Sequence, residues 1–192
     1  MTPHEIIIAE TRAWVNRAVI GLNLCPFAKA VEVKRQIRYV VTEAASPEAL
    51  RESLIAEIHR LLATPPAEIE TTLLIHPRTL TDFLGYNDFL AVAEATLAEL
   101  GGEGVLQVAS FHPQYQFAGT STEDVANATN RSPYPTLHLL REESVSRAVA
   151  TFPNTESIFE TNIRTMQALG AEGWAKLQAQ CRKDAADTDK PE

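Results

Sequence analysis

The stretch Gln107–Arg141, QVASFHPQYQFAGTSTEDVANATNRSPYPTLHLLR, predicts two strands of a sheet and the functional loop between them. It begins in a strand pattern over residues 105–111, ends in another over residues 135–140, and holds a long polar connection between them. Connections of this length inside a compact domain are usually functional or disordered, and this one is poor in Lys, Glu and low-complexity sequence. We therefore predict an ordered loop that carries a functional site.

Helices and strands alternate on both sides of this stretch. Two further strands are predicted over residues 36–42 and 70–76, because both runs are rich in apolar or β-branched residues and end at turn signals. Capping residues, prolines and glycines mark the ends of the predicted helices. Three long helices are predicted from Thr2-Pro3 to about residue 22, from Ser46-Pro47 to residue 61, and from residue 81 or 86 to residue 100. Three more are predicted over residues 143–151, 154–169 and 174–181.

This order of elements predicts an α/β or α+β fold. The sheet is expected to be mixed and partly parallel, with about four strands, and to be flanked by helices from both termini. The fourth strand follows a loop instead of a crossover helix. We therefore expect it to run antiparallel, at an edge of the sheet or beside the third strand.

The composition is that of one globular domain. Of the 192 residues, 45% are hydrophobic and 22% are charged, which is ordinary for a folded soluble protein. We predict a single domain over residues 1–182 and a disordered C-terminal tail over residues 183–192, because the tail is polar and charged. The net charge of −8 argues against nucleic acid or an anionic membrane surface as a partner, since both require a basic face. The sequence is compatible with a homo-oligomer but does not indicate one.

The sequence also predicts a cellular compartment. No apolar run approaches the roughly 20 residues of a membrane span, and no basic region precedes an apolar core at the N-terminus. The two cysteines, Cys25 and Cys181, lie far apart in unlike contexts, which fits a reducing compartment better than a disulfide scaffold. These features predict a cytoplasmic protein.

Cys25 is the first catalytic candidate, as a nucleophile or redox thiol. It lies near the predicted start of a short helix, where free N–H groups and the helix dipole would lower the pKa of a thiol. The tetrapeptide CPFA that it begins is similar to the one-cysteine active-site turn of omega-class glutathione transferases and to the Cys-Pro-x-x turn of glutaredoxins. In those folds a strand precedes the motif, whereas here a long helix does. The alternative is a buried apolar cysteine between Leu24 and Phe27.

His112 is the second catalytic candidate, with Tyr115 as its partner or acid. It follows the strand over residues 105–111, and the strand ends of open α/β sheets commonly hold site residues. An imidazole there can act as a general base, unless it only closes the turn through a backbone hydrogen bond. His76, which is a candidate for substrate binding, also ends a strand and also precedes a proline. If the two strands run parallel, both His-Pro corners lie at the same edge of the sheet.

The end of the long connection is rich in hydrogen-bond donors. Arg131 lies between amide and hydroxyl side chains, and its planar guanidinium is suited to bind a carboxylate or phosphate. The substrate-binding candidates here are Asn127, Asn130, Arg131 and Ser132. The alternative is that Asn130 and Ser132 form turns and that Arg131 pairs with one of the acidic residues of the chain.

His138 is a further substrate-binding candidate, although a strand histidine is usually a core residue with a satisfied hydrogen bond. With Cys25 and His112 it could form a Cys/His metal site. No close-spaced pair such as His-x-x-x-His or Cys-x-x-Cys supports that alternative. The sequence also lacks a Walker loop, a Gly-x-Gly-x-x-Gly fingerprint and a Gly-x-Ser-x-Gly elbow, so the cofactor remains unknown.

Three blocks of the sequence resemble a bacterial and plastid family known as domain of unknown function 1415. The blocks are LNLCPFAK at Leu22–Lys29, ETTLLIHPRTLTDFLGYNDFL at Glu70–Leu90, and QVASFHPQYQFAG with TNRSPYPTLHLLREES within Gln107–Ser144. The resemblance spans most of the chain and implies a single-domain soluble protein. It implies no activity and no catalytic residue.

These observations favour a small cytosolic enzyme that acts on a small anionic molecule. In this hypothesis Arg131, Asn127 and Asn130 bind the anion. His112 moves a proton with Tyr115 nearby, and a Cys thiolate serves as nucleophile or redox group, as in a transferase, a hydrolase or a redox enzyme. The alternatives are a non-catalytic module that binds a small ligand with the same loop, and a Cys/His metal-binding protein.

Overall fold

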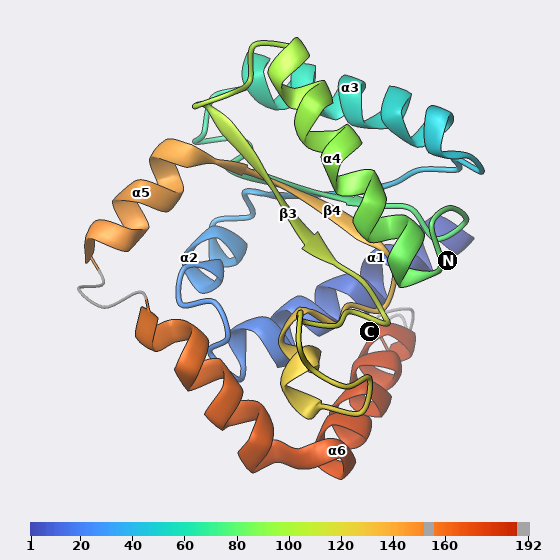
Figure 1. The fold of residues 1–192 in the computed structure, drawn as a ribbon, viewed down its shortest axis with the longest axis vertical. Helices are drawn as coiled ribbons and strands as arrows, with labels where there is room; N and C mark the ends of the chain where they lie inside the picture. Colours follow the sequence, from blue (N-terminus) through green and yellow to red (C-terminus); the bar gives the residue numbers. More distant parts are fainter. Residues whose placement is uncertain (152–155, 188–192) are drawn as a thin grey trace.

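A four-stranded sheet forms the centre of the computed structural model, which describes residues 1–151 and 156–187 (Figure 1). Its spatial order is β1-β2-β4-β3, with β1 (Ile37–Val41), β2 (Thr71–Ile75), β3 (Leu106–Phe111) and β4 (Thr136–Arg141). β1 and β2 are parallel, and β4 is antiparallel to both of its neighbours. The predicted mixed, partly parallel sheet is therefore confirmed. The fourth strand runs antiparallel beside the third, as predicted, but it lies in the interior of the sheet because it also pairs with β2.

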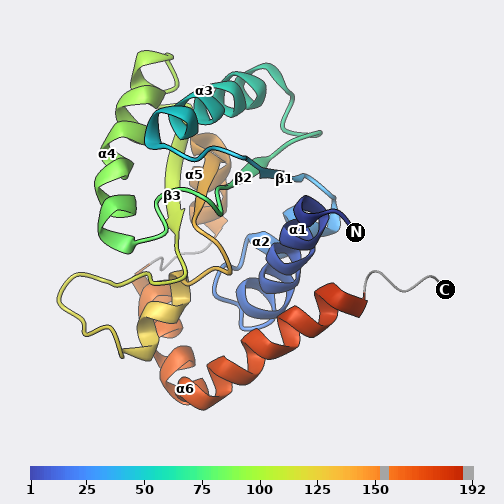
Figure 2. The ribbon, with the colours of Figure 1, turned by 90° about the vertical axis from the view of Figure 1, so that its right-hand side faces the viewer.

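Helices α3 (Pro47–Ala63) and α4 (Phe83–Glu99) cover one face of the sheet, which we name the first face (Figures 1 and 2). Each helix begins at a side chain that accepts a backbone N–H group: Ser46 in α3 and Asp82 in α4. Alternate strand residues point to this face and pack with apolar residues of the helices. The cluster includes, with exposed fractions of 5% or less, Leu50, Leu54, Ile58, Leu74, Tyr86, Phe89, Leu137 and Leu139.

Helices from both ends of the chain pack against part of the opposite face, the second face. α1 (Pro3–Trp14) begins in a capping box made by Thr2 and Glu5 and continues into a π-helix, η1 (Val15–Ile20). α6 (Glu156–Asp187) contacts both. The second cluster includes Trp14, Val15, Ala18, Val19, Leu24, Leu73, Met166 and Trp174. The prediction that helices from both termini flank the sheet is therefore confirmed, and the fold is of the α+β class.

α6 consists of two helices that meet at a kink, as the sequence predicts. Gly170 adopts φ 68° and ψ 171°, which is not helical and ends the first of them. Glycine tolerates this positive φ because it has no Cβ. The two pieces predicted over residues 154–169 and 174–181 correspond to the two helices on either side of Gly170, and the predicted start at residue 154 lies outside the described residues.

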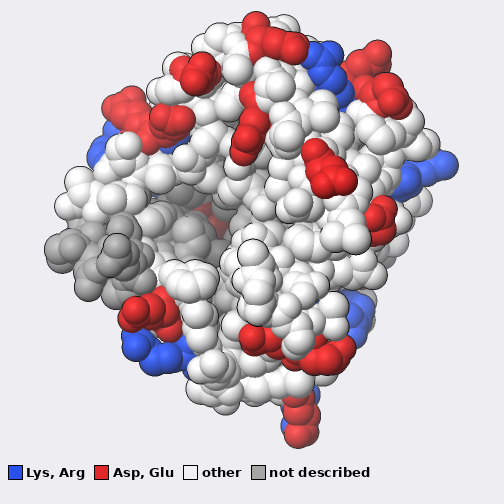
Figure 3. Space-filling view, viewed as in Figure 1, with Lys and Arg blue, Asp and Glu red and all other residues white. Residues whose placement is uncertain are grey.

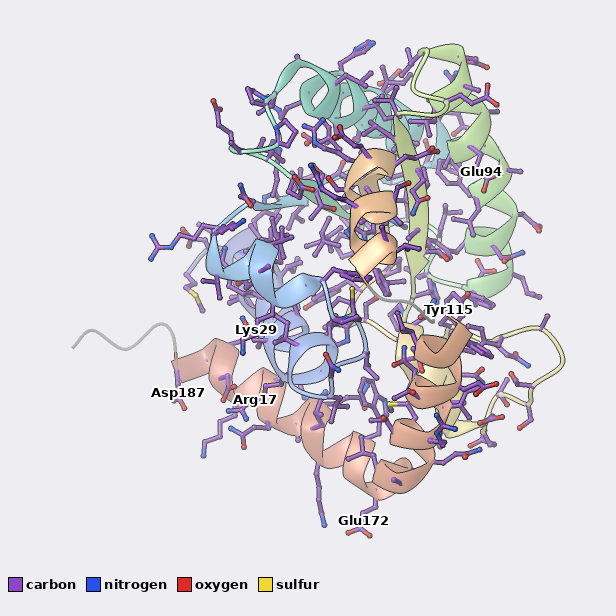
Figure 4. The ribbon with its side chains drawn as sticks, turned by 90° about the vertical axis from the view of Figure 1, so that its left-hand side faces the viewer. Arg17, Lys29, Glu94, Tyr115, Glu172 and Asp187 are labelled. Carbon is purple, nitrogen blue, oxygen red and sulfur yellow. The ribbon has the colours of Figure 1, made fainter. Side chains whose placement is uncertain are left out.

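The predicted disordered tail is wrong for residues 183–187, which continue α6. The guanidinium of Arg17 in η1 donates to the Asp184 carboxylate, with 3.0 Å between Nη2 and Oδ1, and Ala185 is only 3% exposed. Figure 4 shows Arg17 beside this half of the helix, near Asp187. Residues 188–192 lie outside the described residues.

Two short helices, α2 (Ala28–Val33) and α5 (Glu142–Thr151), lie beside the part of the second face that α1 and α6 leave uncovered. A 3-10 helix, η2 (Val125–Asn130), forms within the connection between β3 and β4 and packs against α6. No helix in residues 1–151 and 156–187 combines the length and the apolar composition required to cross a membrane.

Candidate functional site

A pocket of about 960 Å³, which we name the sheet-face pocket, lies on the second face between the strands and the short helices α2 and α5. In Figure 3 the molecule is hollowed at the left of the view, where Figure 1 has these two helices. Its floor includes the cross-strand neighbours Leu73 of β2, His138 of β4 and Ala109 of β3. Most of the lining side chains are apolar, and the polar ones include the charged residues Lys34, Glu70, Arg141 and Arg147, a combination that small-molecule sites commonly show.

His138 is the imidazole on the floor of this pocket. Its Nε2 lies 2.7 Å from Oγ1 of Thr71, which is itself 2.6 Å from the carbonyl oxygen of Leu139. Burial lowers the pKa of His138 to about 4, so the ring is neutral at physiological pH. The residue is half-buried, and it lines the pocket instead of being enclosed by the core. Its role as a substrate-binding residue stays a prediction that this position favours.

Cys25 also lines the sheet-face pocket, but its surroundings do not activate the thiol. Burial raises the pKa of Cys25, and the N–H groups of Phe27 and Ala28 offset this only in part. α2 begins at Ala28, with Phe27 as its N-cap, so the sulfur precedes the first turn. The expectation of a lowered thiol pKa is wrong, because desolvation of the thiolate outweighs the two hydrogen bonds. Cys25 packs against the second cluster, as the alternative interpretation expects.

The two His-Pro corners lie at one edge of the sheet, as predicted, because β2 and β3 are both antiparallel to β4. His76 and His112 are 0% exposed and lie next to the ring of Tyr86, at centroid distances of 5.7 and 5.0 Å. Nδ1 of His112 accepts from the N–H of Gln114 at 3.0 Å, and Nε2 donates to the carbonyl of Leu80 at 3.2 Å.

These bonds give His112 the geometry of a residue that fixes two turns. Both ring nitrogens are engaged by backbone groups, and burial lowers the pKa of the ring. His76 donates from Nδ1 to the carbonyl of Thr79 at 3.0 Å, and burial lowers its pKa to about 4. Neither histidine lines the sheet-face pocket. The backbone-bonded alternative therefore describes His112 better than the general-base hypothesis does.

Tyr115 belongs to an aromatic cluster beyond the end of β3. Its ring lies 5.2 Å from that of Phe83 and 5.0 Å from that of Phe117, between ring centroids. Phe117 in turn contacts Phe159 of α6 at 5.7 Å. Figure 4 shows Tyr115 beside the first turns of α6. The side chain thus joins the long connection to α4 and α6, and unlike Cys25 it does not line the sheet-face pocket.

The donor-rich end of the long connection is bonded mainly to its own backbone. Asn127 is 0% exposed; its Oδ1 accepts from the N–H of Phe117 and its Nδ2 donates to the carbonyl of Ser121, at 2.9 and 2.8 Å. Arg131 donates to the carbonyls of Tyr115 and Thr122 at 3.1 and 2.8 Å. Burial lowers the pKa of Arg131, although nearby acidic residues oppose this. These donors hold the connection in shape.

The neighbouring candidates follow the same pattern. The backbone carbonyl of Asn130 accepts from the N–H of His112 at 3.2 Å. The hydroxyl of Ser132 donates to the carbonyl of Tyr134 at 2.6 Å, and Ser132 is only 3% exposed. The predicted ordered loop thus owes its order to hydrogen bonds that its own polar residues make.

Arg131 and Ser132 line a separate, smaller pocket of about 220 Å³ between α1, α6 and residues 131–134. Glu10 lies in its wall and accepts a hydrogen bond from the hydroxyl of Tyr134. Burial and this carboxylate together raise the pKa of Tyr134. The charged residues of this small pocket are Glu10, Arg131 and Arg182, and the guanidinium of Arg131 already donates to two backbone carbonyls. Of the predicted residues, the structure thus brings Cys25 together with His138, and Arg131 together with Ser132, in two different pockets.

The metal-binding alternative has no matching ligand set. Within residues 1–151 and 156–187, no three His, Cys, Asp or Glu side chains are grouped so that they could hold a metal ion. Cys25 and His138 line the sheet-face pocket, whereas His112 is bonded at both nitrogens to the backbone elsewhere. The three residues named for that alternative therefore do not form one site.

The residues that sequence reasoning missed are walls of the sheet-face pocket, chiefly Trp14, Thr71, Ala109 and Phe111. The sequence does indicate which residues of one strand lie on the same face of the sheet, because residues two apart in β2 and in β3 share a face. The pattern does not say which strands are neighbours. Only the order β1-β2-β4-β3 brings Thr71 and Ala109 to the same floor as His138.

Comparison with known proteins identifies a family without an activity. A family model described as "Protein of unknown function (DUF1415)" matches residues 6–176 of the 192-residue chain. No curated protein matches the chain, and no solved structure matches it. The residues that line the sheet-face pocket all lie within the matched range.

Proposed function

The chain belongs to the DUF1415 family, whose description names no activity, and from its geometry we propose that the protein binds a small, largely apolar molecule in the sheet-face pocket. The observation that supports this function is the pocket itself, with its volume of about 960 Å³ and its mostly apolar walls. Pockets for small ligands have volumes of roughly 300 to 1,000 Å³ and similar walls.

The apolar walls explain why a ligand would stabilise the protein. On the first face, apolar strand residues such as Leu74 and Leu137 are 0% exposed beneath α3 and α4. On the second face, Ala109, Phe111 and Leu140 remain partly exposed in the pocket. Removing apolar surface from water is favourable by about 25 cal/mol per Å². A molecule that covers this floor would supply the burial that the short helices α2 and α5 leave incomplete.

A bulky residue on the floor should block binding. The substitution Ala109→Phe adds a ring inside the pocket, and aromatic residues are well tolerated in strands. We expect the variant to bind the neutral fluorescent probe N-phenyl-1-naphthylamine at least about tenfold more weakly than the wild-type protein, a loss of about 1.4 kcal/mol. The measurement is a fluorescence titration.

The matched control for this experiment is Ala95→Phe, which makes the same change at an exposed position of α4. Its affinity for the probe should equal that of the wild-type protein. If Ala109→Phe and the wild-type protein bind the probe equally, the probe is not in the sheet-face pocket and the proposal loses its basis.

A second candidate is a thiol-dependent enzyme that acts on the ligand of the same pocket. The observation that favours it is that Cys25 and His138 both line the sheet-face pocket, where a thiol can serve as nucleophile and an imidazole can accept its proton. The anionic-substrate version of this hypothesis has less support, because Arg131 and Asn127 donate to backbone carbonyls of the long connection.

The reactivity of Cys25 distinguishes the two candidates. Because burial raises the pKa of this thiol, we expect iodoacetamide to alkylate it more slowly at pH 7.5 than it alkylates free cysteine. The alkylation rate should rise only at pH values above the ordinary pKa of a cysteine thiol. The rate is measured in Cys181→Ser, which leaves Cys25 as the only thiol. A rate that reaches its plateau below pH 8 would favour the enzyme and contradict the raised pKa.

A further inference from the structure

We propose that the ligand of the sheet-face pocket carries a neutral hydrogen-bond donor, such as a hydroxyl or an amide N–H group, which it donates to Nδ1 of His138. This inference rests on the proposed function, because it specifies the chemistry of the molecule bound in that pocket. It follows from a chain of three groups: the ring of His138, the hydroxyl of Thr71 and the carbonyl of Leu139.

The hydroxyl of Thr71 determines which nitrogen of His138 carries the hydrogen. Oγ1 of Thr71 lies 2.6 Å from the carbonyl oxygen of Leu139 and 2.7 Å from Nε2 of His138. A carbonyl oxygen can only accept a hydrogen bond, and a hydroxyl has one hydrogen to donate. The hydrogen of Thr71 therefore points to Leu139, and Nε2 of His138 must itself carry a hydrogen that it donates to Thr71.

Nδ1 of His138 is then an acceptor without a hydrogen. A neutral imidazole has one donor and one acceptor nitrogen, and burial keeps this ring neutral. In the part of the chain that the structure describes, no group donates to Nδ1, yet this atom is not among the polar atoms that are buried without a partner. The nitrogen is therefore accessible. Because His138 is half-buried and lines the pocket, the accessible side of the ring faces the pocket.

The surroundings of Nδ1 favour a donor over an acceptor or an anion. The cross-strand neighbours on the floor are Leu73 and Ala109, and the ring of Phe111 lies 5.7 Å from that of His138, so these three neighbours of the ring are apolar, whereas the hydroxyl of Thr71 lies at Nε2. A ligand carboxylate or ether oxygen placed there would set its lone pairs against the lone pair of Nδ1. A ligand hydroxyl or amide N–H would satisfy it, and an acceptor left unsatisfied in an apolar site is costly.

Two probes that differ in one group test this inference. 2-Naphthol and 2-methylnaphthalene share a ring system and nearly the same size, but only the first can donate. Their dissociation constants are measured by displacement of N-phenyl-1-naphthylamine. The preference for 2-naphthol is the dissociation constant of 2-methylnaphthalene divided by that of 2-naphthol. We expect this ratio to be about 3- to 10-fold larger in the wild-type protein than in His138→Phe, because one neutral hydrogen bond changes affinity by about this factor.

Adjacent threonines provide a matched pair of variants. Thr71→Val removes the hydroxyl that fixes the hydrogen on Nε2 and should reduce the preference for 2-naphthol. Thr72→Val makes the same change one residue later, where alternation directs the side chain to the first face and where Oγ1 is buried without a partner in the described residues. This control should keep the wild-type preference.

The outcomes separate the inference from the function on which it rests. If the preference for 2-naphthol is equal in the wild-type protein and in His138→Phe, while both bind the probes, the hydrogen bond to His138 is contradicted but ligand binding in the sheet-face pocket is not. If none of the three naphthalene compounds binds the wild-type protein, the proposed function falls.

The hydrogen on His138 can also be located without any substitution. Long-range proton–nitrogen correlation spectra of the ligand-free wild-type protein at pH 7 distinguish the two neutral forms of the ring. We expect the hydrogen on Nε2 and none on Nδ1. A spectrum that shows the hydrogen on Nδ1 overturns the inference, because the ring would then present a donor to the pocket.

Discussion

Acidification from pH 6.5 to pH 4 is expected to lower the free energy of unfolding by at least about 3 kcal/mol through buried histidines alone. The main contributor is His76, which is 0% exposed and whose pKa is lowered by burial from 6.5 to about 4. Between these values the unfolded chain binds a proton at this residue and the folded protein does not. The contribution of His76 to the free energy of unfolding is therefore fully present above pH 6.5 and is lost as the pH drops toward 4. His138 adds to the effect, with a smaller share because it is only half-buried.

The share of His76 is measured by urea unfolding of the wild-type protein and of His76→Gln at pH 7 and pH 4.5. Glutamine does not titrate and can still donate to the carbonyl of Thr79, so the variant should lose less stability on acidification than the wild-type protein. The control is His59→Gln, at an exposed position of α3, which should follow the wild-type protein. Acidic residues titrate similarly in all three proteins and cancel in the comparison. An unchanged pH dependence in His76→Gln would show that His76 is not buried in the neutral form.

The substitution Arg141→Met is expected to destabilise the protein by about 3 kcal/mol, because three carbonyl groups lose their donor. Arg141 is 9% exposed, and its Nη2 donates to the carbonyls of Leu61, Thr64 and Ile69 at 2.8, 2.6 and 3.0 Å. Leu61 lies in the last turn of α3, whose final carbonyls have no partner within the helix. One guanidinium at the end of β4 thus holds the end of α3 and the segment that leads into β2.

Urea unfolding at pH 7 measures this loss. The matched control is Arg60→Met, in which an exposed arginine of α3 is replaced and only a long ion pair to Glu57, 3.9 Å between Nε and Oε1, is removed. Because Arg60 is more than half exposed and Glu57 keeps its shorter pair with Arg38, we expect this loss to be about 0 to 1 kcal/mol. If Arg141→Met destabilises the protein no more than Arg60→Met does, the bonds from Arg141 to the three carbonyls are not formed in solution.

The elements of the fold could be predicted from the sequence because their signals are local. The alternation over residues 36–42 and 70–76 lies in neighbouring residues, and so do the caps at Thr2, Ser46 and Asp82. The end of α6 could not be predicted in this way. It depends on the pairing of Asp184 with Arg17, which are 167 residues apart in the sequence.

The candidate site was harder to predict, because the same local pattern is compatible with opposite roles. A histidine that ends a strand before a proline looks the same whether its ring faces a ligand or, as in His112, donates to the carbonyl of Leu80. The pKa of Cys25 likewise depends on how deeply distant segments bury it. His138 was named as a candidate, but its relation to Thr71 follows from the pairing of β2 with β4, which no local pattern records.

The interior position of β4 has a consequence for how the protein forms during synthesis. Within residues 1–151 and 156–187, β4 is the last strand in the sequence, and it joins the pair β1–β2 to β3. Until residues 136–141 have left the ribosome, β3 has no neighbouring strand and β2 has an unpaired edge. Unpaired edges invite contacts with other chains. During synthesis, β1–β2 and β3 thus remain separate until β4 is available. The six residues of β4 then join them into one sheet.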